Sequence, residues 1–403
     1  MPLRPPAGYI RPGYDPLKVP NAPTGVTGTA GDTQVSVAFT PPTNVGGSAV
    51  SAYYAVSNPD GITASGASSP VTVTGLTNDQ PYTFTVWALN TYGPSPYSAA
   101  SGSVTPEVLQ RGIFAGGDGS TLGVTNTIQY ISIATTGNSL DFGDLTQARR
   151  GLGGCASTTR GVFGGGESVS SGVNTIDYVT IATTGNATSF GQLNSTNRMA
   201  TAACNSSTRG VWGGGLIVNT TTSSMAYITI ASTGNSTTFG NLTTARLWLA
   251  ACSSSTRGVF SGGNTGGGTA LNVIDYITIA STGDATDFGD LTQALGYVAS
   301  ASNSTRGIIA GGFDGSSSVN VIQYITIASA GNATDFGDLS YSNMGLSACT
   351  NSTRCVMAGG ANGNNNTISY VTIASTGNAT SFGNLVDRMG YMAACSNTNG
   401  GTQ

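Results

Sequence analysis

A repeat of 48 or 49 residues fills the chain from residue 111 onwards. Each copy starts with an arginine and runs through a short apolar stretch to a pair of glycines. The six arginines, here called the anchor arginines, are Arg111, Arg160, Arg209, Arg257, Arg306 and Arg354. A unit of this length cannot bury a core alone, so its copies must pack against one another. The period therefore predicts a propeller or a solenoid.

Each copy reads as four short β-strands, because apolar alternations are separated by clusters of Gly, Asn, Ser and Thr. In the second copy we expect strands near residues 160–166, 175–182, 188–193 and 198–204. The third strand carries Tyr178, and the fourth-strand region carries Phe190 in a Phe-Gly-x-Leu motif. Four strands are the content of one propeller blade, which favours a six-bladed β-propeller over a solenoid.

The phase of the repeat predicts how the ring closes. In a blade, the Arg-Gly strand is the second strand, and the strand that precedes it is the first, innermost one. The first copy begins with a second strand at Arg111, whereas the chain ends with a first strand near residues 386–397 that no Arg-Gly strand follows. We expect this last strand to complete the blade that begins at residues 111–145. Such closure would remove the exposed sheet edges that could pair with other chains.

The copies resemble kelch blades. They share the Gly-Gly that closes the second strand, the tyrosine of the third strand and an arginine placed in several first strands, including Arg149, Arg198 and Arg246. They differ in the fourth strand, where kelch blades usually carry tryptophan and this chain carries phenylalanine, as at Phe142. The resemblance implies blade geometry within a propeller that spans residues 107–403.

The sequence of residues 20–106 predicts a separate β-sandwich. Together with the strands of the repeat, it makes all-β the expected fold class of the whole chain. Residues 34–39, 52–56 and 82–89 alternate apolar and polar side chains between turns rich in Pro, Gly and Asn. The segment resembles a fibronectin type III domain at Pro23, residues 39–42 and residues 76–82. The resemblance makes Tyr82 the corner tyrosine and implies a spacer or an adhesion module.

Residues 1–19 are too rich in proline for a helix and contain no apolar run typical of a signal peptide. They read as an extended arm. One interpretation is a terminus without fixed structure, and the other is an arm that docks on a partner through Pro-rich and aromatic contacts. The docking residues would be Leu3, Arg4, Pro5, Tyr9, Ile10, Arg11 and Tyr14.

The composition limits the chemistry. The chain has no histidine, 8% charged residues and a net charge of -4, which gives no footprint for nucleic acid and no segment for membrane insertion. Ser-His-Asp hydrolases and propeller copper oxidases need histidine. We therefore expect a non-enzymatic protein without catalytic residues, metal or cofactor.

Five cysteines occupy one repeat position, and Ala301 takes the sixth place. These cysteines are Cys155, Cys204, Cys252, Cys349 and Cys395. Equivalent strands of different blades hold them too far apart for disulfides, and an alanine in one copy indicates a small apolar site. Cys355 replaces the glycine that follows the anchor arginine, and we expect a partly exposed free thiol there.

The copies differ most in the loop after each Gly-Gly. Candidate receptor-binding positions in these loops are Asp118, Glu167, Leu216, Asn264, Phe313 and Asn362. Variable loops on a rigid scaffold can form a binding surface for a glycan, an envelope component or a protein, or they can be unconstrained solvent loops. The six anchor arginines either grip an anionic polymer or serve the scaffold, by stacking on aromatic rings or bonding carbonyls and the carboxylates of Asp144, Asp290 and Asp338.

The recurring Tyr-Ile-Thr-Ile-Ala-Ser-Thr-Gly-Asn-Ala-Thr-x-Phe-Gly-Asp-Leu motif, together with the basic Pro-rich arm, resembles virion structural proteins of tailed bacteriophages, especially phages of cyanobacteria. The resemblance implies a tail-fibre or baseplate-associated adhesin. Its arm would dock on other virion proteins, its loops would meet host surface glycan, and it would form a homo-oligomer in the particle after synthesis in the host cytoplasm without a signal peptide. A capsid decoration or head-fibre protein and a bacterial extracellular adhesin are the alternatives.

Overall fold

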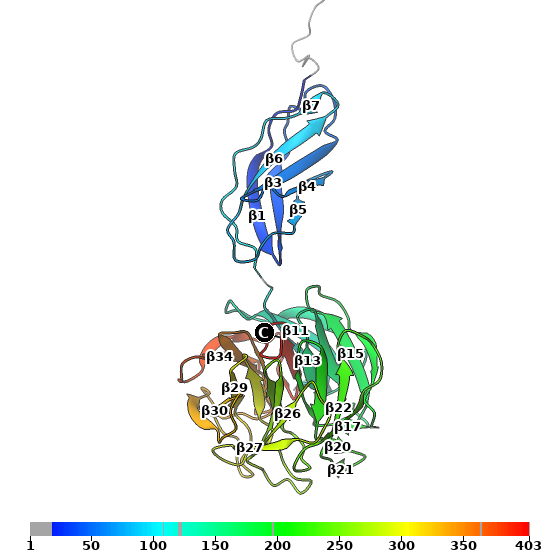
Figure 1. The fold of residues 1–403 in the computed structure, drawn as a ribbon, viewed down its shortest axis with the longest axis vertical. Coiled ribbons are helices and arrows are strands. Elements are labelled where there is room, and N and C mark those ends of the chain that lie inside the picture. The colour runs from blue at the N-terminus through cyan, green and yellow to red at the C-terminus, as the bar shows by residue number, and fades with distance from the viewer. Residues whose placement is uncertain (1–17, 108, 120–122, 196, 363–364, 403) are drawn as a thin grey trace, which may run out of the picture. The chain divides into compact units, whose positions relative to one another are not determined.

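The computed structural model describes residues 18–107, 109–119, 123–195, 197–362 and 365–402. Their regular elements are all β-strands, which confirms the all-β class (Figure 1). Within these ranges no helix is long and apolar enough to cross a membrane. The predicted docking residues Leu3, Arg4, Pro5, Tyr9, Ile10, Arg11 and Tyr14 lie outside the described residues. The chain divides into an N-terminal unit that ends at Leu109 and a repeat region that starts at Gln110.

The N-terminal unit contains two antiparallel sheets, in the orders β1-β2-β5 and β4-β3-β6-β7. The strands are β1 Thr24–Gly31, β2 Gln34–Thr40, β3 Ala52–Asn58, β4 Thr63–Gly66, β5 Val71–Thr74, β6 Thr83–Asn90 and β7 Gly93–Pro94. Alternate residues of β2, β3, β5 and β6 are buried, as the period of two requires for strands with one face on a core. Phe39, Tyr53 and Phe84 are among the largest side chains of that core.

Tyr82 fixes the corner of this unit. Its hydroxyl accepts a hydrogen bond from the Thr77 amide (3.1 Å) and donates one to Asp60 Oδ2 (2.8 Å). The ring is 1% exposed, so the hydroxyl satisfies its hydrogen-bonding needs inside the protein. A tyrosine that bonds backbone a few residues upstream is the corner expected of a fibronectin-like sandwich.

Serines at a spacing of three close the edge beside β6. Ser95, Ser98 and Ser101 each donate their amide to a β6 carbonyl, and each hydroxyl accepts the amide of the same β6 residue. The segment therefore satisfies the outer hydrogen-bonding groups of β6 without forming a regular strand. Covering an edge in this way reduces the risk of pairing with other chains.

The repeat region contains six four-stranded antiparallel sheets, numbered here 1 to 6 along the chain. Sheet 1 contains β8 Arg111–Ala115, β11 Thr127–Ser132, β12 Leu140–Asp144 and β37 Ala393–Ser396; sheet 2 β13 Gly153–Ala156, β14 Arg160–Gly164, β15 Thr175–Thr180 and β16 Thr188–Gln192; sheet 3 β18 Ala202–Asn205, β19 Arg209–Gly213, β22 Ser224–Thr229 and β23 Thr237–Asn241. Sheet 4 contains β24 Ala250–Ser253, β25 Arg257–Ser261, β26 Val273–Thr278 and β27 Thr286–Asp290; sheet 5 β28 Ala299–Ser302, β29 Arg306–Ala310, β30 Val321–Thr326 and β31 Thr334–Asp338; sheet 6 β32 Ser347–Thr350, β33 Arg354–Ala358, β34 Thr367–Thr372 and β35 Thr380–Asn384.

Short three-stranded sheets sit at the loops of two of these sheets. They consist of β9 Asp118–Gly119, β10 Gly123–Val124 and β36 Met389–Gly390 at sheet 1, and β17 Arg198–Met199, β20 Leu216–Ile217 and β21 Thr220–Thr221 at sheet 3. Arg198 therefore lies in β17 and not in a first strand, and Arg149 and Arg246 precede β13 and β24. The expected placement of these arginines in the first strands was wrong, because the chain turns at a left-handed residue between each arginine and the strand that follows.

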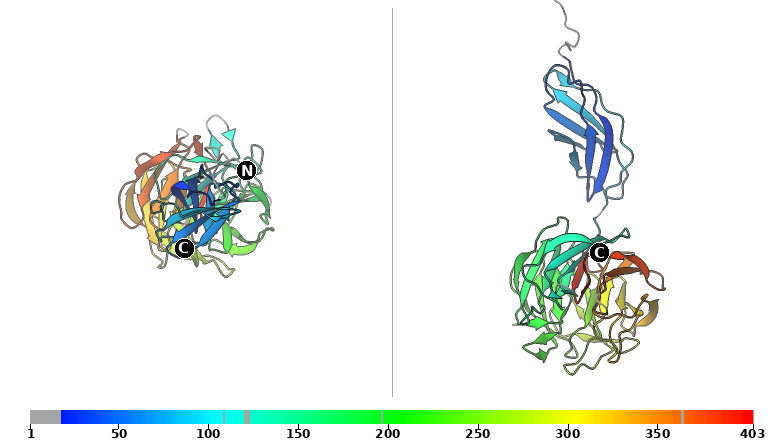
Figure 2. Two further views of the ribbon diagram at one scale, coloured as in Figure 1. Left: turned by 90° about the horizontal axis from the view of Figure 1, so that it is seen from above. Right: turned by 180° about the vertical axis from the view of Figure 1, so that it is seen from behind.

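The first strands of the six sheets contact one another in a cycle. β13 contacts β18, the contacts continue through β24, β28 and β32 to β37, and β37 contacts β13. In Figures 1 and 2 the sheets follow one another in chain order around the repeat region. Sheet 1 joins both ends of the region, because β37 pairs with β8 in the register Ala393 to Ala115 and Ser396 to Gly112.

The glycine pairs join each sheet to the next. The second glycine donates its amide to the carbonyl of the residue four before the next first strand, as Gly166 does to Arg198 (2.8 Å) and Gly360 to Met389 (2.9 Å). Both glycines have left-handed φ, at +71° and +108° for Gly165 and Gly166. A side chain on Gly165 would also lie 2.6 Å from the Arg198 carbonyl oxygen, so both conformation and space require glycine here.

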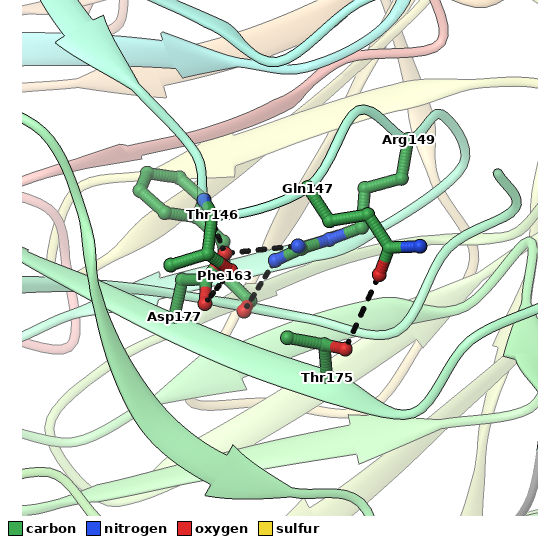
Figure 3. A network of polar contacts seen from close by, with 6 residues as sticks. All are labelled: Thr146, Gln147, Arg149, Phe163, Thr175 and Asp177. Atoms are coloured by element: carbon green, nitrogen blue, oxygen red, sulfur yellow. Dashed lines mark hydrogen bonds and ion pairs between the residues drawn. The ribbon is translucent and has the colours of Figure 1, made fainter.

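Arg149 and Asp177 form a buried ion pair inside sheet 2 (Figure 3). Arg149 Nη1 lies 2.9 Å from Asp177 Oδ2, and both side chains are 0% exposed. Thr146 donates its amide and hydroxyl to the same carboxylate. Burial lowers the pKa of Arg149, and Asp177 opposes that shift. Arg246 and Asp275 repeat the arrangement in sheet 4, at 2.8 Å.

Sheets 3 and 5 lack this ion pair. Sheet 5 has Leu295 at the arginine position and Gln323 at the aspartate position, where the Gln323 oxygen accepts the amide and hydroxyl of Thr292. In sheet 3, Ala226 takes the aspartate position, and Arg198 bonds the Ser224 carbonyl oxygen instead (2.7 Å). Burial lowers the pKa of Arg198 to about 10. Leu295 and Gln323 thus show that an uncharged pair can occupy the positions of the arginine and the aspartate within the same fold.

Asp177→Ala should lower the free energy of unfolding by about 3–5 kcal/mol, because it leaves Arg149 buried without its carboxylate. Arg149→Leu combined with Asp177→Gln copies Leu295 and Gln323 and should return stability to within about 1 kcal/mol of the parent chain. Urea unfolding of the three full-length chains measures both effects. A double variant as unstable as the single one would contradict this account.

The repeated cysteines pack over the glycine that follows the anchor arginine in the next sheet. A Cβ on Gly210 would lie 2.5 Å from Cys155 Sγ, and one on Gly258 would lie 2.4 Å from Cys204 Sγ. Between sheets 5 and 6 the sizes are exchanged: Ala301 replaces the cysteine, and Cys355 replaces the glycine. Cys355 is 0% exposed, so the expectation of a partly exposed thiol was wrong. All six cysteines are free and buried.

Alkaline pH should destabilise the repeat region through these thiols. Burial raises the pKa of Cys252 from 9.0 to about 11 and that of Cys395 to about 12. Above pH 9 the unfolded chain loses thiol protons that the folded chain keeps. The contribution of the buried thiols to the free energy of unfolding is therefore complete below pH 9. It declines as the pH rises, by up to about 1.4 kcal/mol per pH unit for each thiol.

Urea unfolding at several values between pH 8 and pH 10.5 measures this slope, and Cys395→Ala is the matched variant because Ala301 already occupies the equivalent position in sheet 5. The variant should show a shallower decline. Identical slopes in the two chains would contradict the assignment to Cys395.

Candidate functional site

The repeat region has two ends with different contents. Because the strands are antiparallel, the start of each first strand, the end of each second strand and the loop that follows lie at one end, here called the loop face. The turns between first and second strands lie at the other end, here called the tail face. The chain enters the region at Gln110 and Arg111 on the tail face, where the Asn397 side chain accepts the Arg111 amide (3.0 Å).

A closed ring of backbone hydrogen bonds lies at the loop face. It surrounds the central axis of the cycle that the first strands form. Six residues, each two positions before a first strand, donate their amide to the carbonyl of the previous member at 2.8–2.9 Å. They are Gly151, Ala200, Trp248, Tyr297, Gly345 and Tyr391, and the last bond runs from Gly151 to Tyr391. All six have left-handed φ between +55° and +65°. The ring therefore uses both polar groups of each member.

The six ring positions carry unlike side chains. Glycine or alanine occupies three of them, and large aromatic side chains occupy Trp248, Tyr297 and Tyr391. The centroid of the Trp248 ring lies 5.0 Å from that of Tyr297 in a stacked arrangement and 5.1 Å from that of Tyr391. All three are half-buried. This aromatic cluster is a part of the repeat where one copy differs strongly from another.

Below the aromatic cluster lies a cavity of about 110 Å³. Its wall consists of the ring residues and the first-strand residues beneath them, including Gly154, Ala203, Ala251 and Ser300. Among the described residues that line it, none is Asp, Glu, Lys or Arg. The cavity is therefore an uncharged space with a wall of mostly small residues, hydroxyl-bearing ones included, and an aromatic mouth.

The C-terminal residues close the other end of this space. Gly400 donates its amide to the Ser302 carbonyl (2.7 Å), and Asn205 Nδ2 donates to Asn399 Oδ1 (3.3 Å). Asn399 also lines a smaller cavity among the lower halves of the first strands. Residues 397–402 thus lie across the tail face, and the larger cavity is approached from the loop face.

The predicted loop positions lie beside the ring. Glu167 pairs with Arg150, Leu216 with Met199, Asn264 with Leu247, and Phe313 with Gly296, while Asp118 pairs with Gly390. In each case the partner is the residue that precedes a ring member. Asn362 is exposed and donates its amide to Asn343 Oδ1 (3.2 Å). The six positions therefore form the bases of the loops around the aromatic cluster.

Two of these positions hold charge at the rim. Arg150 forms ion pairs with Asp118 and with Glu167, the latter at 3.2 Å between Nε and Oε2. These three side chains are about one-third exposed, so the attraction is screened by water. They link the loops of sheets 1 and 2 and lie near Tyr391, whose pKa is raised by burial and by Tyr297.

Asn264 and Tyr297 form a neutral part of the rim. Asn264 is 3% exposed, and its Oδ1 has no hydrogen-bond partner among the described residues. Burial raises the pKa of Tyr297, while a hydrogen bond with Asn264 opposes the shift. The phenol therefore stays protonated at neutral pH. Tyr297 also contacts Phe313 edge to face, with ring centroids 6.5 Å apart.

The anchor arginines lie at the starts of the second strands, on the tail face. Each guanidinium lies over the third-strand tyrosine of its own sheet, 4.3–4.9 Å from the ring centroid. Each also donates to a carbonyl just after the third strand of the next sheet, as Arg160 does to Ile230 (2.9 Å). The members are Arg111, Arg160, Arg209, Arg257, Arg306 and Arg354, and the bonds from Arg354 reach Ile133 and Ala134 of sheet 1. Their observed partners are aromatic rings and carbonyls of the scaffold.

The described residues contain no group of three or more His, Cys, Asp or Glu side chains that could hold a metal ion. The buried ion pairs of sheets 2 and 4 join the segment before the first strand to the third strand, away from solvent. The groups that the loop face presents around the cavity are aromatic rings, hydroxyls and amides, with the charged side chains Asp118, Arg150 and Glu167 at the rim.

The aromatic cluster was not among the sequence predictions. Its signal is present in the repeat, because one position reads Gly, Ala, Trp, Tyr, Gly and Tyr while neighbouring positions hardly change. The loops after Gly-Gly vary in length as well, which makes them the more visible difference between the copies in the sequence. Only the fold shows that these six residues meet around one axis.

Comparison with known families finds a match in the N-terminal unit. Residues 21–103 match the fibronectin type III domain. The match ends before the repeat region, and comparison with curated proteins gives no match to the chain. The match of residues 21–103, together with the two sheets and the corner formed by Tyr82, identifies the N-terminal unit as a fibronectin type III domain.

Proposed function

We propose that the repeat region is a closed six-bladed β-propeller of the kelch-like type. Three observations support this proposal: each sheet has four strands, the first strands contact one another in a cycle, and β37 pairs with β8. The interlocking hydrogen bonds of the Gly-Gly pairs and of the loop-face ring also run around the whole cycle. A propeller is a rigid support for loops of variable sequence.

The function that this arrangement supports best is non-enzymatic adhesion. We propose a virion structural protein of a tailed bacteriophage, acting as a tail-fibre or baseplate-associated adhesin that binds host surface glycan. The observation that carries the adhesive role is the separation of the two faces. The variable loops and the aromatic-mouthed cavity share the loop face, whereas the chain entry and the repeated anchor contacts lie on the tail face.

The remaining parts fit the same role. The fibronectin type III domain would act as a spacer, and the Pro-rich arm would dock on other virion proteins in a homo-oligomer. The virion setting rests on the resemblance of the repeated motif and the arm to phage structural proteins. The neutral and aromatic lining of the cavity favours sugar over nucleic acid, whose phosphates need cationic partners.

Charge added to the loop face should abolish glycan binding, whereas the same charge on the tail face should not. Val169 and Val218 are 85% and 61% exposed on the loops of sheets 2 and 3. Ser207 and Ser255 are exposed in the tail-face turns of sheets 3 and 4. We expect the full-length Val169→Asp/Val218→Asp chain to lose binding on an array of bacterial surface polysaccharides, and Ser207→Asp/Ser255→Asp to bind as the parent does.

Equal loss in both double variants, or no polysaccharide binding by the parent chain, would contradict the adhesive role. Electron cryomicroscopy of the particle tests its location. Density for this chain at the tail with the loop face outward agrees with the proposal. Density on the capsid shell, or a loop face buried against the particle, would instead favour a decoration protein.

A further inference from the structure

We propose that the aromatic cluster and the cavity beneath it form a binding site for one uncharged pyranose ring, at the terminus of a glycan. This site would be the specificity pocket of the loop face and rests on the proposed glycan-binding function. The loops would supply the outer contacts, and Trp248, Tyr297 and Tyr391 would hold the sugar ring.

The scaffold does not require aromatic side chains at these positions. Gly151, Ala200 and Gly345 occupy the equivalent places and make the same backbone hydrogen bonds with the same left-handed conformation. A bulky β-carbon substituent is in fact unfavourable in that conformation. Half-exposed Trp and Tyr at three of six equivalent positions therefore need a reason other than ring formation.

The positions of the large and small residues are complementary. The Trp248 ring extends over Gly151, where a Cβ would lie 2.9 Å from its Cη2 atom. The Tyr391 ring extends over Gly345 in the same manner, at 2.7 Å. The small residues thus give the aromatic rings room to lie across the mouth. This arrangement breaks the sixfold repeat and creates one site per chain.

The size and charge of the cavity limit its ligand. A volume of about 110 Å³ is below the 300–1,000 Å³ of pockets for drug-sized ligands, so the space is too small for an oligomer. Its described lining carries no charged side chain, and burying an unpaired charge there would be costly. The preferred ligand is therefore small and uncharged.

The polar groups favour a ligand with hydroxyls at its edge. Thr201, Ser300 and Ser347 carry hydroxyls among the residues that line the cavity. The hydroxyls of Tyr297 and Tyr391 stay protonated and can donate. A pyranose combines a C–H face that packs on aromatic rings with hydroxyls around its perimeter, which matches this combination of groups.

The test titrates the full-length chain with methyl glycosides of glucose, galactose, mannose and N-acetylglucosamine. Tryptophan fluorescence and saturation-transfer NMR report binding. Trp212 is fully buried and Trp87 stacks on Tyr54 in the N-terminal unit, so a fluorescence change should come from Trp248. At least one glycoside should bind with one site per chain.

Trp248→Ala should weaken that binding about tenfold or more, because it removes the largest ring of the mouth. Trp248→Phe keeps a ring and should retain binding within about threefold. Tyr97→Ala, which removes a 61% exposed tyrosine from the N-terminal unit, is the matched control and should bind as the parent does. Thermal unfolding checks that each variant is folded, and Tyr391→Ala serves as the second probe if Trp248→Ala is unstable.

The outcomes separate this inference from the proposed function. Polysaccharide binding that depends on Val169 and Val218 but is unchanged in Trp248→Ala and Tyr391→Ala overturns the pocket and leaves the adhesin. Glycoside binding lost in Trp248→Ala, without any polysaccharide binding, supports the pocket and overturns the adhesin. Tighter binding of glucuronic or sialic acid than of neutral glycosides overturns the uncharged specificity.

Discussion

Pairing between β37 and β8 is the interaction on which the rest of the repeat region depends, because it joins the last strand of the chain to the first strand of the repeat. Without it, sheet 1 would lack its first strand, and the cycle of first-strand contacts would open between β32 and β13. Strand pairing at this point also places residues 397–402 across the tail face, so the same contact that closes the cycle closes one end of the central space.

Interactions between sheets follow two rules, one for the backbone and one for the side chains. Backbone bonds from the Gly-Gly pairs and the loop-face ring recur in every sheet, since main-chain groups are the same in every copy. Side chains are exchanged in compensating sets. Cys155 faces Gly210, whereas Ala301 is matched by Cys355, and Arg149 with Asp177 becomes Leu295 with Gln323. The hydrogen bonds that Thr146 and Thr292 donate to the third-strand side chain are kept, while the residue that accepts them changes.

This division explains how the loop face can acquire a specific site. The left-handed backbone ring is stabilised by main-chain hydrogen bonds, so its side chains are free to vary from glycine to tryptophan. Three aromatic rings gathered on one part of the mouth turn a repetitive scaffold into an asymmetric one. Anchor arginines show the opposite behaviour, because each stacks on a tyrosine and bonds the next sheet, and all six are retained.

Periodicity and turn chemistry determined much of this structure from sequence. Regular spacing of the arginines predicted six copies, Tyr178 and Phe190 marked the third and fourth strands, and Tyr82 marked the fibronectin-like corner. These features are local, since they depend on strand alternation and on residues that turns require. Compensation at Cys355 was not predictable, because the size of its neighbour, Ala301, lies in another copy.

The tertiary structure alone decided where the copies meet. Trp248, Tyr297 and Tyr391 are separated by about one or two repeat lengths, and nothing local in the sequence brings them together. They form a cluster because the cycle of sheets places one position of every copy on the same ring around the axis. The sequence thus determined the strands and their count, whereas packing around an axis determined the cavity, its aromatic mouth and its closure by the C-terminal residues.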